Sequence, residues 1–549
     1  MDDALYKAFL AEMEELEKFR MAYSALHPRA PLGREDQDVR RLVESLAFFT
    51  ARTRVSGQRA ILRSTLRLFR QHFSFLLNPL PSMGLLRART DARFVDASEL
   101  PRGTHVAVTP PSGPAFQYRT TSALRLLPLK LASVDGFKRG PREGERLLLR
   151  FDAGFPRNDE PGTLRLYVRH LGEFASSLAA HYHLKSALSS ASVVFDTEVG
   201  QDTSGTPVRV RFGAPPLLPE ETEAFEHPLQ RTRSFLHFPE QSLFMDVALP
   251  VPPRNWKSFT VVLDLTSKWP AQLRLTRDSF ELNVVPLLNA VKQTANPVEV
   301  DGTKDRYLLT HPDASGGYRL HSLVGVYRLD QEGLVPLRPG VVQGGESSYE
   351  LEVDGTGASR KAHLAVELAG AFDEPVVVSA EAFWLQPLVD PLDPAACRVR
   401  PAERHLEGVQ WDLLAVPTPS TDNPLGQSQD GLLRLLSLKN QRFVGLEELQ
   451  FLLSALGAHD VRHFRELLPL LRTLEVASLP FAKAGSGYKY VYTLQLAELD
   501  PYLLPVLDLF SAQLLDLLRA WSTEEVVELL VHVPNLELTT SYPRPEAVP

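Results

Sequence analysis

Apolar residues recur at steps of three and four along the first 83 residues, which is the spacing of one face of an α-helix. In the first predicted helix these residues are Leu5, Phe9, Met13, Leu16, Phe19, Tyr23 and Leu26. The helix ends at His27-Pro28, because proline lacks an N–H and restricts the residue before it. A second helix is predicted to start near Asp36 or Asp38 and to break at Gly57. We therefore predict three helices, the third running from about Gln58 until the two prolines that follow Asn78.

The third predicted helix carries its own apolar stripe, formed by Leu62, Leu66, Phe69, Phe73 and Leu76. A stripe this narrow needs a partner, which is either the other two helices or another chain. We take these five residues as the expected partner interface. Residues 1–83 are thus predicted to be a bundle-forming helical region.

From Gly84 onward the pattern changes to short alternating runs separated by Pro- and Gly-rich turns, which indicates β-strands. Three further domains are expected: a β-rich domain at 84–213 with a helix at 174–189, a second β-rich domain at 214–400, and a mixed domain at 401–549. In the last domain, helices are predicted at 431–438, 446–456, 459–471 and 503–520, and strands at 488–496 and 525–533. The predicted fold class is α+β: a helical bundle segment, then antiparallel β-rich domains, then a mixed C-terminal domain.

Cysteine content, net charge and the length of the apolar runs argue against a disulfide-bonded, a polyanion-binding or a membrane-inserted protein. The chain has 549 residues, a net charge of -8 and a single cysteine, Cys397. Internal disulfides are thereby excluded, and a reducing compartment is favoured. The net charge gives no general argument for binding a polyanion. No run of about eighteen apolar residues exists, so no membrane insertion is expected and we predict a cytoplasmic protein.

One spacing resembles a metal site. His459 and His463 are four residues apart, so on a helix they would share a face and could hold one ion. A zincin motif would have Glu after the first histidine, whereas Asp460 stands there, and no third ligand is evident. A metal-dependent hydrolase therefore stays an alternative. Cys397 lies in a Pro-rich connector, with neither a helix N-terminus nor a histidine beside it in the sequence, so a role as nucleophile is not favoured. We predict no catalytic residue, no metal and no cofactor.

A basic face forms a second alternative. Arg59, Arg63, Arg67 and Arg70 fall at steps of four, four and three, and therefore share one helix face. This face could dock an acidic protein or a nucleic acid. No aromatic residues interleave in a way that suggests base stacking, so a solvated face is favoured and nucleic-acid binding is not expected.

Short motifs recur in order along nearly the whole chain and together resemble a known family. They are the acidic helix start at 1–3, the His27-Pro28 break, residues 38–51, 75–83, 100–104, 118–121, 238–240, 282–287, 301–303, 433–438 and 507–520. The chain resembles TssF, the baseplate wedge subunit of bacterial type VI secretion systems. Residues 382–385 and 508–515 depart from the family pattern.

The resemblance implies a scaffold and no enzyme. It implies a wedge made with a TssG-like subunit and a second TssF copy, with TssK, TssE and a VgrG-like spike hub as further partners. The wedge would connect the spike hub to the contractile sheath and to the membrane complex, at the inner face of the bacterial inner membrane. The helices of residues 1–83 would then join a bundle shared between subunits.

Overall fold

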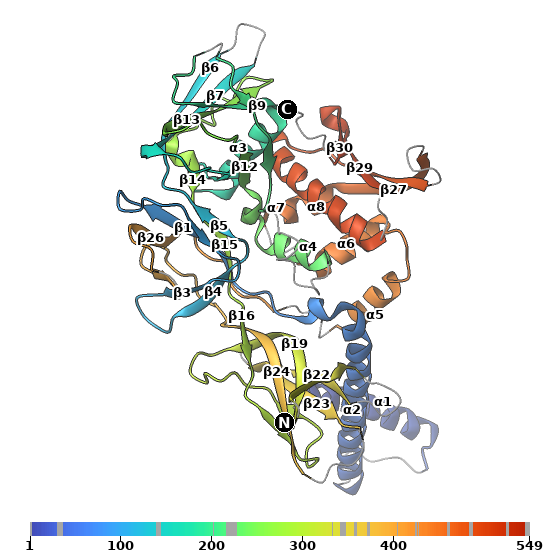
Figure 1. Ribbon diagram of the computed structural model, residues 1–549. Coiled ribbons are helices and arrows are strands. Elements are labelled where there is room, and N and C mark those ends of the chain that lie inside the picture. The colour runs from blue at the N-terminus through green and yellow to red at the C-terminus, as the bar shows by residue number, and fades with distance from the viewer. Residues whose placement is uncertain are drawn as a thin grey trace. The chain divides into compact units, whose positions relative to one another are not determined.

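The computed structural model of the chain describes residues 3–29, 37–138, 144–200, 203–215, 228–331, 333–340, 347–355, 359–369, 374–402, 405–422, 425, 428–457, 462–481, 487–522 and 526–543. The chain forms two compact units, which are Met1–Leu77 with Pro424–Asn440, and Asn78–Asn423 with Gln441–Pro549. The first is helical and the second contains all the sheets (Figure 1). The predicted α+β class, with helices first, antiparallel sheets next and a mixed sheet last, is confirmed.

The helical unit contains three helices in its described residues: α1 (Asp3–Leu26), α2 (Gln37–Leu77) and α5 (Gln429–Leu438). The predicted break at Gly57 is wrong, because α2 continues through that residue. A lone glycine costs a helix only about 1 kcal/mol, which the good helix formers around it offset. The one non-helical residue inside α2 is Phe73, at φ -134° and ψ 40°.

Small residues of α2 let α1 pack closely against it. Ala47, Ala51 and Val55 are buried and lie four residues apart, so they form one face. Glu12 of α1 accepts a hydrogen bond from Arg54 of α2 at 3.0 Å, which adds a charged contact between the two helices. Near the other end of α2, α5 packs on the helix and the Nζ atom of Lys439 lies 2.8 Å from Nδ1 of His72.

A six-stranded antiparallel sheet in the second unit combines strands from three separate stretches of the chain. In spatial order its strands are β25 (Arg398–Pro401), β3 (His105–Thr109), β4 (Phe116–Thr120), β15 (Val284–Leu288), β1 (Met83–Thr90) and β26 (Val409–Leu413). Its core includes Leu86, Tyr118 and Val285, which are all fully buried. The sheet combines strands from the predicted ranges 84–213, 214–400 and 401–549, so the chain returns to it twice.

Two sheets pack face to face after this one and share one core. The first is β10 (Thr206–Pro207), β9 (Leu188–Phe195), β13 (Trp256–Leu265), β7 (Glu145–Arg157) and β6 (Lys130–Lys138), and the second is β11 (Val210–Phe212), β12 (Phe244–Ala248), β8 (Thr163–Val168) and β14 (Phe280–Leu282). Phe151 and Phe259 stack in the core at 5.1 Å between ring centroids. Arg146 pairs with Asp264 at 2.7 Å, so both buried charges are neutralised where β7 meets β13.

A second pair of sheets follows. One contains β16 (Val291–Thr294), β24 (Val376–Leu385), β19 (Arg319–Asp330), β20 (Gly333–Pro336) and β17 (Val298–Val300), and the other contains β18 (Tyr307–Leu308), β23 (Lys361–Glu367), β22 (Ser348–Asp354) and β21 (Arg338–Pro339). Trp384 is 2% exposed in their common core and donates its indole N–H to the Gln293 carbonyl at 3.0 Å. Two short strands elsewhere, β2 (Ser98–Leu100) and β5 (Leu124–Leu126), pair with each other.

The last sheet is mixed and has helices beside it. Its order is β27 (Leu471–Phe481), β28 (Gly487–Leu496), β29 (Val527–Val533) and β30 (Leu538–Tyr542). Only β28 and β29 are parallel, and α8 (Leu504–Ser522) is the crossover that parallel strands require. Helix α8 packs with α3 (Phe174–Ala187), α4 (Pro228–His237) and α7 (Arg462–Leu467), and α6 (Leu446–Ala455) packs with β27.

The helices and strands predicted beyond residue 84 have mixed outcomes. The helices predicted at 174–189, 431–438, 446–456 and 503–520 and the strands at 488–496 and 525–533 are confirmed to within a few residues. The helix predicted at 459–471 is wrong at its end, because α7 stops at Leu467, a short 3-10 turn follows and β27 begins at Leu471. Residues 459–461 lie outside the described residues.

The segment that leads from Asn78 into β1 is held by side chains from distant parts of the second unit. Arg233 of α4 donates to the Asn78 carbonyl at 2.7 Å. His321 of β19 lies 3.0 Å from the Pro79 carbonyl through Nδ1, and His237 of α4 lies 3.1 Å from the Pro81 carbonyl through Nε2. Two of these side chains come from α4 and one comes from β19, and together they fix the path of this proline-rich segment.

Candidate assembly surface

The five residues predicted as a partner interface do not share one environment. Phe69 and Leu76 are fully buried and Phe73 is 5% exposed, whereas Leu62 and Leu66 are half-buried. The rings of Phe69 and Phe73 lie 5.4 Å apart. A partner could reach the three buried residues only if this end of α2 rearranged. Their contact with another chain stays a prediction, and within it Leu62 and Leu66 are the accessible positions.

The same helices expose other apolar side chains. Those at least half exposed on α2 are Leu42, Leu46, Phe49, Ile61 and Leu68, and those nearly half exposed or more on α1 are Tyr6, Leu10, Phe19, Met21 and Leu26. Leu42, Leu46 and Phe49 are spaced by four and three residues, so they form one patch, which we name the Leu42 patch. It lies on the side of the helix opposite the Ala47 face that α1 covers, since Phe49 is two residues, or about 200°, from both Ala47 and Ala51.

The Leu42 patch is large for a surface that faces only water. Leu42 is 69% exposed, Leu46 50% and Phe49 62%. Single exposed apolar residues are ordinary, but contiguous ones typically mark an interaction site. The apolar periodicity of the sequence includes these residues, but periodicity alone does not tell which side of the stripe the neighbouring helix covers.

The predicted arginine face is present on α2. Arg59, Arg63 and Arg67 are exposed and Arg70 is half-buried. Arg59, Arg67 and Arg70 all take part in polar or ring contacts. The face is therefore partly engaged by the chain itself, and its proposed roles in docking stay untested.

The histidine pair cannot be placed. His459 lies outside the described residues, and the side chain of His463 on α7 is not described either. Elsewhere, in the residues that the structure does describe, no group of three or more His, Cys, Asp and Glu side chains is placed to hold a metal ion.

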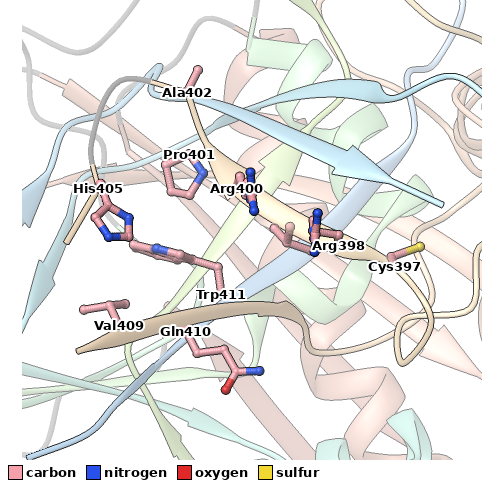
Figure 2. Close-up of a pocket in the computed structure, with 10 residues that line it drawn as sticks. Cys397, Arg398, Arg400, Pro401, Ala402, His405, Val409, Gln410 and Trp411 are labelled. Carbon is pink, nitrogen blue, oxygen red and sulfur yellow. The ribbon is translucent and has the colours of Figure 1, made fainter. Parts of the chain in front are cut away.

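An open hollow of about 820 Å³ lies beside β25 and β26, the two end strands of the six-stranded sheet. Figure 2 shows His405 close to Trp411 on one side of the hollow and Cys397 at the opposite end. Arg398 and Arg400 alternate along β25 with the buried Val399. Burial raises the pKa of the Cys397 thiol, so the reactive thiolate is scarcer at neutral pH. Among the described residues that line the hollow, none carries a carboxylate that could act as a general acid or base.

The comparison with protein families decides the affiliation of the chain. The family model described as "Type VI secretion system, TssF" matches residues 1–345. The chain belongs to the TssF family. The matched region includes α1 and α2, the first pair of packed sheets and part of the second, so it also contains the Leu42 patch. No protein of the curated collection matches the chain.

Two solved structures share the fold of this TssF-family chain. A chain of the type VI secretion system TssK-TssF-TssG baseplate subcomplex, determined by cryo-electron microscopy, matches with a TM-score of 0.72 at 18% identity, covering 92% of this chain and 98% of that one. A chain of the baseplate complex from the type VI secretion system matches with a TM-score of 0.62 at 19% identity, covering 99% of both. At such identities the likeness establishes the fold.

In the described parts of this TssF-family chain, no helix is both long enough and apolar enough to cross a bilayer.

Proposed function

We propose that this chain is a structural subunit of a type VI secretion baseplate wedge. Its membership of the TssF family supports this role, and so does its fold, which matches chains of two baseplate structures over at least 92% of its length. The subunit acts by binding other proteins and performs no chemistry of its own. It connects the spike hub to the contractile sheath and to the membrane complex, on the cytoplasmic side of the inner membrane.

The Leu42 patch is the observation that carries the proposal. Leu42, Leu46 and Phe49 project from a helix whose other face is already covered by α1. A helix that leaves such a row uncovered is suited to pack against helices of another subunit, with the uncovered residues as knobs. We place a TssG-like subunit there, with the half-buried Leu62 and Leu66 extending the contact. A second copy of this chain completes the proposed wedge.

Further partners follow from the same role. One of the matched structures contains TssK and TssG together with TssF, which supports TssK and a TssG-like protein as partners of this chain. TssE and a VgrG-like spike hub complete the proposed neighbourhood. A subunit that connects the spike hub to the contractile sheath has to contact proteins of both.

Coexpression with a TssG-like protein tests the proposal. We expect the two to co-purify, and we expect Phe49→Asp to reduce the co-purified partner at least about tenfold, because a charge placed in an apolar contact loses its hydration. The chain itself should keep its thermal stability, since Phe49 is 62% exposed. Phe69→Asp, by contrast, should destabilise the chain directly, because Phe69 is fully buried.

Val251→Asp is the matched control, because Val251 is 76% exposed and lies in a loop of the other unit. It should leave the amount of co-purified partner unchanged. The proposal would be contradicted by a monodisperse wild-type chain that does not co-purify with the TssG-like protein. It would also be contradicted by a Phe49→Asp variant that co-purifies with as much partner as the wild type.

A further inference from the structure

Strand β27 presents an edge that no other described strand covers. It is the end strand of the C-terminal sheet and pairs with β28 on one side only. In Figure 1 it is the outermost strand of that sheet. Residues 475–480 are exposed, and exposure of every consecutive residue means that both faces of this part of the strand lie open.

The residues of this part of β27 do little to prevent another strand from pairing with the free edge. Residues 476–481 read Val-Ala-Ser-Leu-Pro-Phe and contain no charge. Val476 is 39% exposed and Leu479 49%, and Tyr488 on the neighbouring β28 is 62% exposed. Natural sheets usually blunt free edges with charges, bulges or a covering element, because an uncharged edge recruits another strand. Within the exposed residues 475–480, Glu475 and Pro480 are the protective residues, and they lie at the two ends of the stretch.

The register of the sheet shows which backbone groups point outward. The Tyr490 N–H bonds to the Val526 carbonyl, on the β29 side of β28. Tyr490 therefore points away from β27, and its cross-strand partner Ser478 belongs to a pair without mutual hydrogen bonds. The N–H and C=O groups of Ser478 must then face the free edge, and so must those of Val476 and Leu474, because the direction alternates along a strand.

A hollow adjoins this edge on one face. It has a volume of about 270 Å³ and is lined by Arg442, Phe443, Val476, Ser478, Tyr488 and Tyr490. Arg442 donates to the Tyr490 hydroxyl at 2.8 Å and its guanidinium carbon lies 5.1 Å from the centre of that ring, so these two side chains form one continuous wall. Such aromatic and arginine walls are typical of sites that receive an apolar side chain from a partner.

We propose that a second copy of this chain pairs with β27, edge to edge and antiparallel, about a twofold axis at Val476. In this register Val476 lies opposite Val476 of the second copy, and Leu474 lies opposite Ser478. Every outward N–H of these three residues then finds a carbonyl, whereas a register centred on residue 477 would oppose Leu474 to Pro480, which has no N–H.

The side chains suit this self-pairing. Glu475 is the one charged residue of 473–480, and it would lie opposite Ala477, so no two like charges meet. The side chain of Val476 from each copy would lie on the face of the other copy's hollow. An edge of three to four residues buries well under about 1,200 Å², so the dimer should be weak, in the micromolar range. This contact lies in a different unit from the Leu42 patch and does not depend on the proposed function.

Sedimentation velocity of the full chain tests the pairing over concentrations of about 1 to 200 µM, the range in which interfaces of this size associate. The wild type should pass from monomer to dimer. Val476→Lys should remain monomeric because it places two charges face to face, and Ser478→Pro should do so because it removes an outward donor without touching the bonds to β28. Val251→Lys is the control, and it should dimerise like the wild type.

Cross-linking tests the register. In a Cys397→Ser background, Val476→Cys should form a disulfide-linked dimer on mild oxidation, because the two Cα atoms would be about 5.5 Å apart. Val251→Cys should not. A wild type that stays monomeric throughout, association that Val476→Lys and Ser478→Pro leave intact, or no preferential cross-link at position 476 would each overturn the proposal. Circular dichroism confirms that each variant is folded.

Discussion

At the scale of single residues, burial separates positions that look equivalent in the sequence. Phe49 and Phe69 both lie on apolar rows of α2, yet Phe49 is 62% exposed and Phe69 is not exposed at all. The difference arises because Phe49 lies about half a turn around the helix from the Ala47 and Ala51 face, on which α1 packs. The same contrast holds for polar groups, whose cost depends on whether a partner is present.

Glu240 shows this cost. Its Oε2 atom is buried and has no hydrogen-bond partner within the described part of the chain, although the residue as a whole is half-buried, and burial raises the pKa of its carboxyl group. An acid with a raised folded-state pKa contributes stability at low pH that is lost as the pH rises through that pKa. We expect Glu240→Gln to stabilise the fold by about 1 kcal/mol at pH 8 and to have little effect near pH 4.

Urea unfolding at both pH values measures the effect of this substitution. The exposed Glu498→Gln serves as its control and should change neither midpoint. Equal effects of Glu240→Gln at pH 4 and pH 8 would contradict the interpretation that ionisation is what costs stability.

The two histidines at the entry to β1 should respond in the opposite direction. Burial lowers the pKa of His237 to about 4 and that of His321 to about 3, and nearby arginines add to both shifts. A base with a lowered folded-state pKa contributes stability that is present above its unfolded pKa near 6.5 and is lost as the pH falls toward the folded value. The fold should therefore weaken between about pH 6.5 and pH 4.

A double variant isolates the histidines. His237→Gln and His321→Asn keep a donor near the Nε2 and Nδ1 positions that contact Pro81 and Pro79, but neither can take up a proton. We expect the acid-induced loss to shrink by about 1–2 kcal/mol per histidine, a discounted figure because the rings are half-buried. Chemical unfolding from pH 7 to pH 4.5 provides the measurement, and an unchanged slope would contradict the assignment.

At the scale of elements, α2 shows how far local signals reach. Gly57 predicts a helix break, yet the helix of 41 residues continues through it. Helices in folded proteins gain most of their stability from packing rather than from propensity, so one unfavourable residue does not stop a helix that packs on neighbouring helices. Strand β27 is the opposite case, since it lacks the alternation of buried and exposed residues that marks most strands, and the sequence did not predict it.

Gly57 supplies a direct test. An added Cβ would meet no atom within 4 Å, and the residue is exposed inside a regular helix. Gly57→Ala should therefore stabilise α2 by about 1 kcal/mol through the lower entropy of the unfolded chain. Amide hydrogen exchange should slow about fivefold in the middle of α2. Faster exchange would indicate that the helix opens at Gly57 in solution.

At the scale of the whole molecule, the chain ties its sheets together by returning to them. The six-stranded sheet takes strands from 83–90, 105–120, 284–288 and 398–413, so no single stretch can complete it. Asn289 reinforces this arrangement, because its backbone N–H bonds to Ser82 at 2.8 Å while its side chain donates to the Gln117 carbonyl at 3.1 Å and accepts from the Gln386 N–H at 2.8 Å. It is fully buried.

Asn289→Ala should consequently destabilise the second unit by about 1–3 kcal/mol, because it leaves the buried Gln386 N–H without an acceptor. Urea unfolding followed by tryptophan fluorescence would report it, since Trp384 lies two residues from Gln386. The exposed Asn440→Ala in the helical unit is the control. A loss no larger than that of the control would show that this link is not needed.

The sequence by itself determined the fold class, the main helices, two of the four described strands of the C-terminal sheet and the family resemblance that the family comparison confirmed. These depend on local periodicity and on ordered short motifs, which the sequence displays directly. Only the tertiary structure decided which apolar residues of α2 are buried, that α2 is one helix, that β27 is a strand with a free edge, and which strands share a sheet. Each of these depends on contacts between residues far apart in the chain. The stabilisation that such contacts provide cannot be derived from a local sequence pattern.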